Sequence, residues 1–216
     1  MVSWPIRAAI DTGLFDKVYV STDSHEIADV ASWAGAEILW RPELLADHYT
    51  GTTQVIQDIL EKQLSSLSDK SWIYKIYATS PITDSLLKEF VDYVDRNAAP
   101  FTVSVGRFRT PIEKAMQMSP DGRLTFLNRP NIDSRSQDLE GHFFDAGKLY
   151  AAKVSSWKEA TSPLLENPKG FEIPNWASVD IDTEEDWSMA EALFTQLRGK
   201  VVVDSNHKDL PEKNVQ

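Results

Sequence analysis

Two aspartates near the end of the chain have the residue type and the spacing of a metal site. Asp180 and Asp182 belong to the segment VDIDT, which we expect to form a strand over Ser178–Ile181. Side chains alternate along a strand, so the two carboxylates should share one face, roughly 7 Å apart. Such a pair can hold one Mg²⁺ together with water and phosphate oxygens. The spacing therefore makes a magnesium site one interpretation of this segment.

The same segment also fits a structural role. In this alternative, Asp182 or Thr183 is the N-cap of the next helix, and Glu185 or Asp186 stabilises its first turn. Both interpretations predict a helix that begins at about Thr183.

Hydroxyl side chains follow the strand predicted at Trp72–Tyr77. The segment Ala78-Thr79-Ser80-Pro81 comes directly after it, at the carboxyl end of a strand, where open α/β sheets bind their ligands. Hydroxyl groups there suit a polyhydroxy substrate. The alternative is that Ser80 is a helix N-cap and Pro81 the first helical residue.

Polar residues also end two earlier strands. Ser21-Thr22-Asp23 ends a strand predicted at Lys17–Ser21, and Arg41 follows one predicted at Ala36–Leu39. The planar guanidinium of Arg41 can bind a base or a phosphate. Helix capping by the first group and a surface role for Arg41 are the alternatives.

Alternating apolar strands and amphipathic helices must position these residues. Besides those strands, apolar spacing predicts helices over residues 4–12, 24–34, 52–64 and 83–96, and strands over 101–105, 114–118, 123–127 and 144–151. A last helix is expected from Thr183 to Arg198, ended by Gly199. This pattern predicts an α/β fold in which helices cover a sheet.

Composition narrows the function further. The 216 residues predict one domain, and a net charge of −11 makes nucleic acid an unsuitable partner. The chain has no cysteine, which excludes disulfides and thiolate zinc sites and fits a reducing cytoplasm. The N-terminal residues do not have a signal-peptide pattern, and no apolar run reaches the roughly 20 residues of a membrane span. We therefore expect a soluble, cytoplasmic protein with no membrane partner and a flexible tail over residues 205–216.

Two further features concern phosphate and anion binding. Residues 106–136 carry six basic and three acidic side chains, which suits an anionic ligand, although a solvated face would look the same. The nine glycines are scattered, so neither a P-loop nor a dinucleotide-binding fingerprint is present. We expect that the chain lacks a phosphate-binding loop of its own.

Four segments taken together resemble the acylneuraminate cytidylyltransferases. They are STDSHEIADVASWAGAEILWRPELLADHYTGTT, IYATSP, SRSQDLEGHFFDAGKLY and VDIDTEEDW, in the family's order and spacing over residues 1–198. The last two are most similar to the pseudaminic acid branch. The resemblance implies a three-layer α/β/α fold of the nucleotide-diphospho-sugar transferase type with a mainly parallel central sheet. It also implies a single domain over residues 1–204, with a β-rich dimerisation arm inserted near residues 106–144.

The resemblance further implies a reaction and its site. The family transfers CMP from CTP to the anomeric hydroxyl of a nine-carbon 2-keto sugar acid, with Mg²⁺ present, and releases pyrophosphate. Asp180 and Asp182 match its catalytic, metal-binding pair. The nucleotide-binding residues would be Ser21, Thr22, Asp23, Arg41 and Thr52, and the sugar-binding residues Tyr77, Thr79, Ser80, Arg135, Gln137, Asp138 and Asp145. Arg135 would reach across a homodimer.

Three departures from the family pattern matter. Tyr77-Ala78-Thr79-Ser80-Pro81 stands where the sialic acid branch has Gln-Pro-Thr-Ser-Pro, and Asp145-Ala146-Gly147 stands where it has Asn-Gly-Ala. Both favour pseudaminic acid as the substrate. The family's opening strand and its Ala-Arg-Gly-Gly-Ser-Lys-type loop would lie before Met1, so we expect an N-terminally truncated domain with poor turnover.

The alternatives belong to other classes. One is a truncated, catalytically impaired homologue that acts as a dimerising or sugar-binding module. Another is a cytidylyltransferase for sialic or legionaminic acid. A third is a glycosyltransferase of similar fold that uses Asp180-Ile181-Asp182 as its metal motif.

Overall fold

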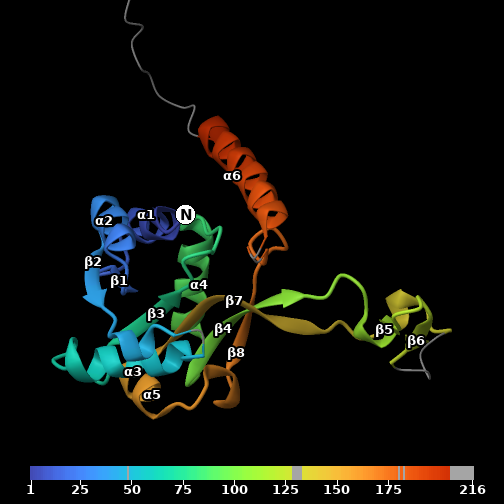
Figure 1. Cartoon of the computed structure of the whole chain (residues 1–216), viewed down its shortest axis with the longest axis horizontal. Coiled ribbons are helices and arrows are strands. Elements are labelled where there is room, and N and C mark those ends of the chain that lie inside the picture. The colour runs from blue at the N-terminus through green and yellow to red at the C-terminus, as the bar shows by residue number, and fades with distance from the viewer. Residues whose placement is uncertain (48, 128–132, 180, 182, 205–216) are drawn as a thin grey trace, which may run out of the picture. The chain divides into compact units, whose positions relative to one another are not determined.

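The computed structural model describes residues 1–47, 49–127, 133–179, 181 and 183–204. The chain divides into two compact units, Met1–Ser178 and Val179–Gln216. The second unit contains the helix α6 (Glu184–Asp204). All other helices and strands described below belong to the first unit (Figure 1).

A parallel pair of strands opens the first unit. After helix α1 (Ser3–Thr12), strand β1 (Tyr19–Thr22) is joined through helix α2 (His25–Ala34) to strand β2 (Glu37–Trp40). The Ser24 side chain accepts a hydrogen bond from the Ile27 N–H, 3.3 Å away, and thereby caps α2. The buried side chains of Ile6 and Ala31 connect α1 and α2.

A four-stranded mixed sheet forms the centre of the unit. Its order is β3 (Trp72–Ile76), β7 (Phe143–Lys153), β4 (Phe101–Arg107) and β8 (Lys169–Glu172). Strand β7 runs antiparallel to both β3 and β4, whereas β8 is parallel to β4.

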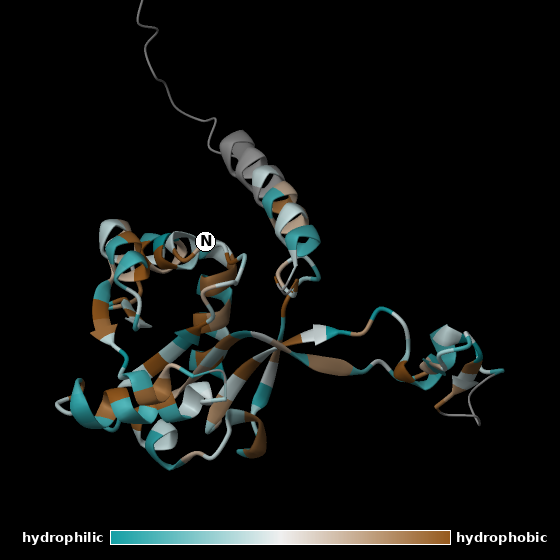
Figure 2. Ribbon diagram, in the orientation of Figure 1, coloured by the Kyte–Doolittle hydropathy of each residue, from teal (hydrophilic) through white to brown (hydrophobic). Residues whose placement is uncertain are grey.

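Helices cover both faces of this sheet. On one face, α4 (Asp84–Arg96) covers β7 and α1 packs beside α4, with Phe90 and Leu149 in the shared core. Figure 2 shows apolar, brown segments in the strands of the sheet and in the helices around it. On the other face, α3 (Thr52–Lys62) and α5 (Val154–Glu159) surround a core that contains Leu60, Phe101 and Trp157. The expected α/β class with helices on both sides of a sheet is therefore confirmed.

The sheet is more mixed than we expected, and it is divided. Among the described residues, β1 pairs only with β2, and β3 pairs only with β7, so β1 and β3 each keep one unpaired edge. The chain returns from the arm along β7, which lies between β3 and β4 and runs antiparallel to both.

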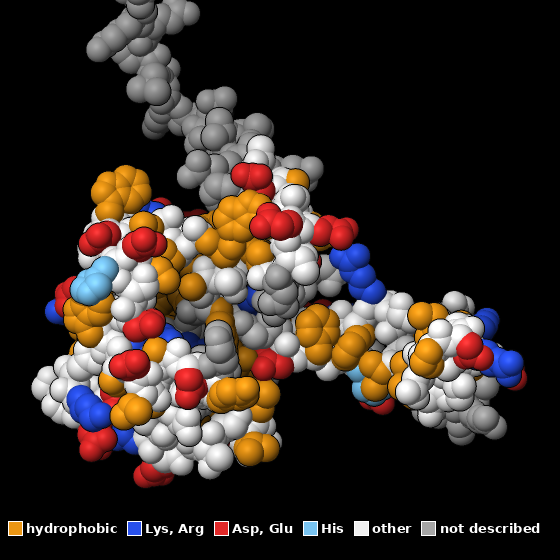
Figure 3. All heavy atoms as spheres, viewed as in Figure 1, with side chains coloured by type: hydrophobic (Ala, Val, Ile, Leu, Met, Phe, Trp, Pro, Cys, Tyr) orange, Lys and Arg blue, Asp and Glu red, His pale blue; other side chains and the backbone are white. Residues whose placement is uncertain are grey.

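The arm, residues 108–142, leaves the sheet after β4 and returns into β7. It carries a short hairpin of β5 (Met116–Met118) and β6 (Leu124–Phe126), whose turn places Gly122 at a φ of +84° (Figure 1). Large apolar side chains are exposed along it: Phe108, Ile112, Met116, Met118, Leu124 and Leu127 (Figure 3).

Several expected boundaries are wrong. Helix α6 continues through Gly199 to Asp204, because a glycine inside a helix costs only about 1 kcal/mol relative to alanine. Ser178 and Val179 belong to no strand, since a turn closed by a 2.9 Å hydrogen bond from the Ala177 N–H to the Pro174 carbonyl precedes them. Strand β8 and helix α5 were not expected. The residues of the expected tail, 205–216, lie outside the described part of the chain.

No helix in the described part of the chain has both the length and the apolar character of a membrane span.

Candidate active site

Three of the predicted site residues surround one lysine. The Lys75 ammonium in β3 donates a 2.9 Å hydrogen bond to the Thr52 hydroxyl at the start of α3. It also lies 4.2 Å from the ring centroid of Tyr77 and 3.9 Å from that of Tyr150. The charge of Asp145 acts on it as well. The structure thus brings Thr52, Tyr77 and Asp145 together around Lys75 and Tyr150, two residues that the sequence did not identify.

The pairing of β3 with β7 creates this cluster. Lys75 lies directly opposite Tyr150 in the antiparallel ladder, so both side chains point to the face covered by α3 and α5. Tyr77 is two residues further along and points to the same face, with its ring centroid 6.2 Å from that of Tyr150. A charged residue in the middle of the apolar run WIYKIY was the one signal in the sequence for Lys75.

Burial changes the pKa of Lys75 and of Tyr150, the two residues that the sequence analysis did not identify. It lowers the pKa of Lys75 to about 8, although the nearby charge of Asp145 acts in the opposite direction. Burial also raises the pKa of Tyr150, and the hydrogen bond to Asp145 raises it further. The neutral Tyr150 hydroxyl donates to Asp145, with distances of 2.8 and 2.7 Å to its two carboxylate oxygens.

A bulge in β7 places Asp145 against Tyr150. Val103 of β4 lies opposite Tyr150, whereas Val105 lies opposite Asp145, so β7 has extra residues between these positions. Within the bulge, Gly147 has a φ of +64° and donates a 3.0 Å backbone hydrogen bond to Asp145. A glycine suits this position because it adopts a left-handed backbone without a steric penalty.

The Ser80 hydroxyl is buried without a partner. Its side chain is 2% exposed, and its oxygen has no hydrogen-bond partner among the described residues. Ser80 does not cap the next helix, because the Thr83 hydroxyl accepts the capping hydrogen bond from the Leu86 N–H at 3.2 Å. The capping alternative for Ser80 is therefore wrong. Thr79, in the same turn, is half-buried.

The predicted nucleotide-binding residues of β1 and β2 also meet. The Arg41 guanidinium donates to the Ser21 carbonyl at 2.9 Å and to its hydroxyl at 3.4 Å. Thr22 has a structural role other than helix capping, because its buried hydroxyl accepts a 3.1 Å hydrogen bond from the Ser24 N–H. The capping alternative for Ser21, Thr22 and Asp23 is wrong. The cap of α2 is Ser24 rather than any of the three preceding residues, and Asp23 is exposed.

The predicted sugar-binding residues of the arm interact with one another. Arg135 donates two hydrogen bonds to Asp138, at 2.7 and 3.1 Å, and Gln137 lies in the short turn between them. Within the described ranges, no hydrogen bond or ion pair joins these three residues to the cluster around Lys75.

The two candidate metal ligands, Asp180 and Asp182, lie outside the described residues. Next to them, Thr183 and Asp186 cap α6 reciprocally: the Thr183 N–H donates to the Asp186 carboxylate at 2.9 Å, and the Asp186 N–H donates to the Thr183 hydroxyl at 3.2 Å. The capping alternative is confirmed for Thr183 and Asp186, and neither bond uses Asp182. In the described part of the chain, no cluster of three or more acidic or histidine side chains could hold a metal ion.

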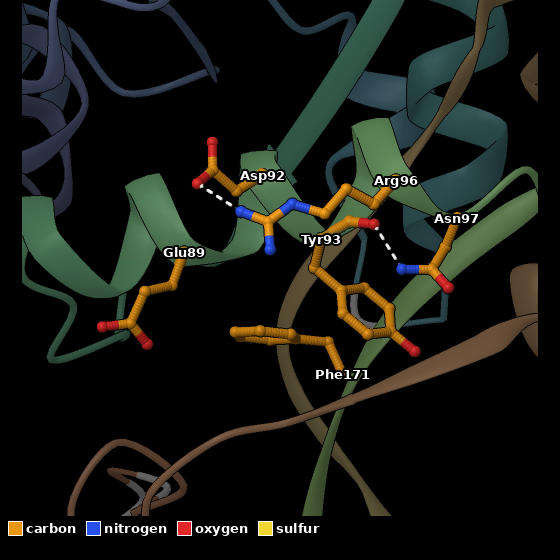
Figure 4. Close-up of a pocket in the computed structure, with 6 residues that line it drawn as sticks. All are labelled: Glu89, Asp92, Tyr93, Arg96, Asn97 and Phe171. Carbon is orange, nitrogen blue, oxygen red and sulfur yellow. Dashed lines mark hydrogen bonds and ion pairs between the residues drawn. The ribbon is translucent and has the colours of Figure 1, made fainter.

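A separate hollow lies between α4 and β8. Its volume is about 270 Å³, and none of the predicted site residues lines it (Figure 4). Several of its polar groups are paired: Arg96 with Asp92 at 2.9 Å, and the Tyr93 hydroxyl with the Gly170 carbonyl at 3.0 Å. The rings of Tyr93 and Phe171 pack 5.3 Å apart.

A family model described as cytidylyltransferase matches residues 1–128, which include the first, second and third strands and the Lys75 cluster apart from its β7 residues. The chain belongs to the cytidylyltransferase family. This assignment confirms the enzyme class implied by the sequence motifs.

Curated relatives of this cytidylyltransferase share its sequence over most of its length. It is 29% identical to the pseudaminic acid cytidylyltransferase of Campylobacter jejuni, over 90% of this chain and 84% of that protein. It is 30% identical to N-acylneuraminate cytidylyltransferase A of Danio rerio, over 88% of this chain but 44% of that protein.

Two solved structures share the fold of this cytidylyltransferase. A CMP:2-keto-3-deoxy-manno-octonic acid synthetase complexed with CTP matches with a TM-score of 0.61 and 14% identity, over 91% of this chain and 88% of the other. A 4-diphosphocytidyl-2C-methyl-D-erythritol synthase matches with a TM-score of 0.58 and 10% identity, over 87% and 89%. At these identities the likeness establishes the fold.

Proposed function

We propose that this cytidylyltransferase transfers CMP from CTP to the anomeric hydroxyl of a nine-carbon 2-keto sugar acid, with pseudaminic acid as the preferred substrate. The anomeric hydroxyl loses its proton to solvent, and its oxygen forms a bond to the α-phosphorus. The bond from that phosphorus to the bridging oxygen breaks, and pyrophosphate leaves. The observation that carries the proposal is the meeting of Thr52, Tyr77 and Asp145 around Lys75. The names of the curated relatives support the substrate class.

The site residues serve mainly to position the reactants. Phosphoryl transfer depends on alignment and charge stabilisation more than on covalent chemistry. Arg41, which Ser21 holds in place, supplies a planar donor for the nucleotide. The unpartnered Ser80 hydroxyl and the Asp145 carboxylate supply a donor and an acceptor for sugar hydroxyls.

Asp180 and Asp182 would hold the magnesium ion. Carboxylate oxygens are suitable ligands for Mg²⁺, and Thr183 and Asp186 form the cap of the helix that follows this pair. When bound, the ion supplies positive charge that offsets the charge developing on the phosphate oxygens.

The arm supports a homodimer as the working form. Its exposed apolar side chains include Met118 at 69% and Leu127 at 67% exposure, and contiguous apolar surface of this kind marks interaction sites. A second copy of the chain is the proposed partner. In such a dimer, Arg135 would approach the partner's site. The absence of cysteine fits a cytoplasmic location.

A second function, as a sugar-binding module without turnover, is favoured by the division of the sheet. Among the described residues, β1 and β3 each have one edge without a paired strand, so the two sheets are not joined through them. Sugar-acid binding measured by calorimetry, without release of pyrophosphate, would identify this module.

The direct test is product analysis. CTP and Mg²⁺ are incubated with pseudaminic, legionaminic or N-acetylneuraminic acid, and pyrophosphate and CMP-sugar are quantified by mass spectrometry. We expect the highest kcat/KM with pseudaminic acid. A higher value with either other acid would reassign the substrate, and sugar transfer from a nucleotide sugar would indicate a glycosyltransferase.

A further inference from the structure

Lys75 has hydrogen-bonding capacity that its surroundings do not use. An ammonium has three N–H donors, and among the described residues Lys75 makes one hydrogen bond, to Thr52. The faces of Tyr77 and Tyr150 attract the cation and restrict its position. They do not accept hydrogen bonds as strongly as an anionic oxygen does. The cluster therefore holds a cation in a fixed place with donors to spare.

Asp145 does not form a close ion pair with this cation. Its carboxylate accepts hydrogen bonds from the Tyr150 hydroxyl and from the Gly147 N–H. Its charge acts on Lys75 from a distance. Lys75 therefore offsets the negative charge of Asp145, but it does not donate a hydrogen bond to this carboxylate.

A purely structural role for Lys75 does not explain these observations. Lys75 is half-buried. Partial burial of an ammonium is unfavourable unless it is paired, and an apolar side chain of similar length would pack at lower cost. The face of β3 that carries Lys75 also carries Ile73, which packs into the core beside α5. A cation kept at such a position, among residues predicted to bind substrate, points to an anionic ligand.

We propose that the Lys75 ammonium binds an anionic oxygen group of the substrate. This inference rests on the proposed function, which supplies two such groups: the carboxylate of the sugar acid and the phosphates of CTP. Two neighbours of Lys75, Tyr77 and Asp145, are predicted sugar-binding residues, and one, Thr52, is a predicted nucleotide-binding residue. We therefore assign the contact to the carboxylate of the sugar acid. Lys75 is then the residue that selects an acid over a neutral sugar.

The proposal predicts how binding depends on pH. The groups that face Lys75 are Thr52 from α3, Tyr77 from β3, and Asp145 and Tyr150 from β7. The pKa of Lys75 is about 8, so the ammonium loses its proton as the pH rises through this value. Binding of the anion should weaken about tenfold between pH 7 and pH 9.

The test is calorimetric titration of wild type, Lys75→Met and Lys75→Arg with N-acetylneuraminic acid, pseudaminic acid and CTP, each at pH 7 and pH 9. We expect Lys75→Met to bind the acid at least tenfold more weakly at pH 7 and to lose the pH dependence. Lys75→Arg should retain binding at pH 9, because its guanidinium stays protonated. Lys153→Met, which removes an exposed charge beside Trp72 on the same sheet, should bind as wild type.

The outcomes separate the possible ligands and failures. Weaker binding of CTP alone would assign the contact to a phosphate. Unchanged affinity of Lys75→Met for both ligands would overturn the inference while leaving the proposed function intact, and a wild type that binds neither ligand would overturn both. If Lys75→Met does not fold, the wild-type pH dependence and the ¹³C NMR titration of the lysine Cε atoms decide. A Lys75 midpoint that does not rise when N-acetylneuraminic acid is added would contradict the proposal.

Discussion

The Ser80 hydroxyl shows how a single atom can separate a binding role from a structural one. A buried hydroxyl without a hydrogen-bond partner costs about 1–3 kcal/mol. We expect Ser80→Ala to keep or slightly raise the melting temperature, because it removes this cost, and to weaken sugar-acid binding several-fold. Thermal unfolding and calorimetry measure the two effects. Ser85→Ala, at an exposed position of α4, is the control, and lower stability of Ser80→Ala with unchanged affinity would make Ser80 structural.

The lowered pKa of Lys75 leads to a second prediction, about the stability of the fold. Its pKa in the folded chain is lowered from the ordinary 10.5 to about 8, so between these values the unfolded chain binds more protons. The cost of the buried charge is therefore fully present below pH 8 and is lost as the pH rises towards 10.5. The melting temperature of Lys75→Met minus that of wild type should therefore be larger at pH 7 than at pH 10. A difference in melting temperature that does not change with pH would show that the ammonium is not buried in solution.

The bulge of β7 is the element that fixes Asp145. We expect Gly147→Ala to destabilise the fold by about 1–2 kcal/mol, because alanine is strained at a positive φ, and to lower kcat/KM by displacing Asp145 from Tyr150. Gly122→Ala is a matched control, since Gly122 also has a positive φ, with no atom near its missing Cβ, but lies in the arm. If both variants lose the same stability but only Gly147→Ala loses activity, the bulge positions Asp145 as proposed. Equal activity in both variants would remove the positioning role of the bulge.

The cap of α6 separates the roles of Asp182 and Thr183. Thr183 and Asp186 form the cap, so Asp182→Asn should leave the melting temperature nearly unchanged while it abolishes Mg²⁺-dependent activity. Thr183→Ala should instead lose about 1 kcal/mol of helix stability. Circular dichroism and a magnesium titration of activity distinguish them. A strongly destabilised Asp182→Asn that retains activity would restore the capping interpretation.

Elements with a strong local pattern could be predicted from the sequence. The apolar spacing of α2, α3 and α4 gave their bounds closely, because each helix buries one face. Strand β8, with the sequence KGFE, was missed because it has no apolar run and exists through its pairing with β4. Lys75 was missed for the same physical reason. Its role depends on the non-local pairing with Tyr150, whereas Thr52, Tyr77 and Asp145 were reached through motifs.

For the whole molecule, we propose that the arm sets the oligomeric state. We expect the wild type to be a dimer and the double variant Met118→Glu with Leu127→Glu to be a monomer, because charges on a buried apolar interface are costly. Light scattering coupled to gel filtration measures this. Leu165→Glu, a 75% exposed position outside the arm, should remain dimeric. A wild type that is monomeric at all concentrations would contradict the proposal.

Formation of a CMP-sugar acid by this chain is tested most directly by mass spectrometry of the reaction of CTP and Mg²⁺ with pseudaminic acid. We expect a CMP-sugar and one equivalent of pyrophosphate. The absence of any CMP-sugar from pseudaminic, legionaminic and N-acetylneuraminic acids, both with this chain and with one extended at its N-terminus, would contradict this expectation.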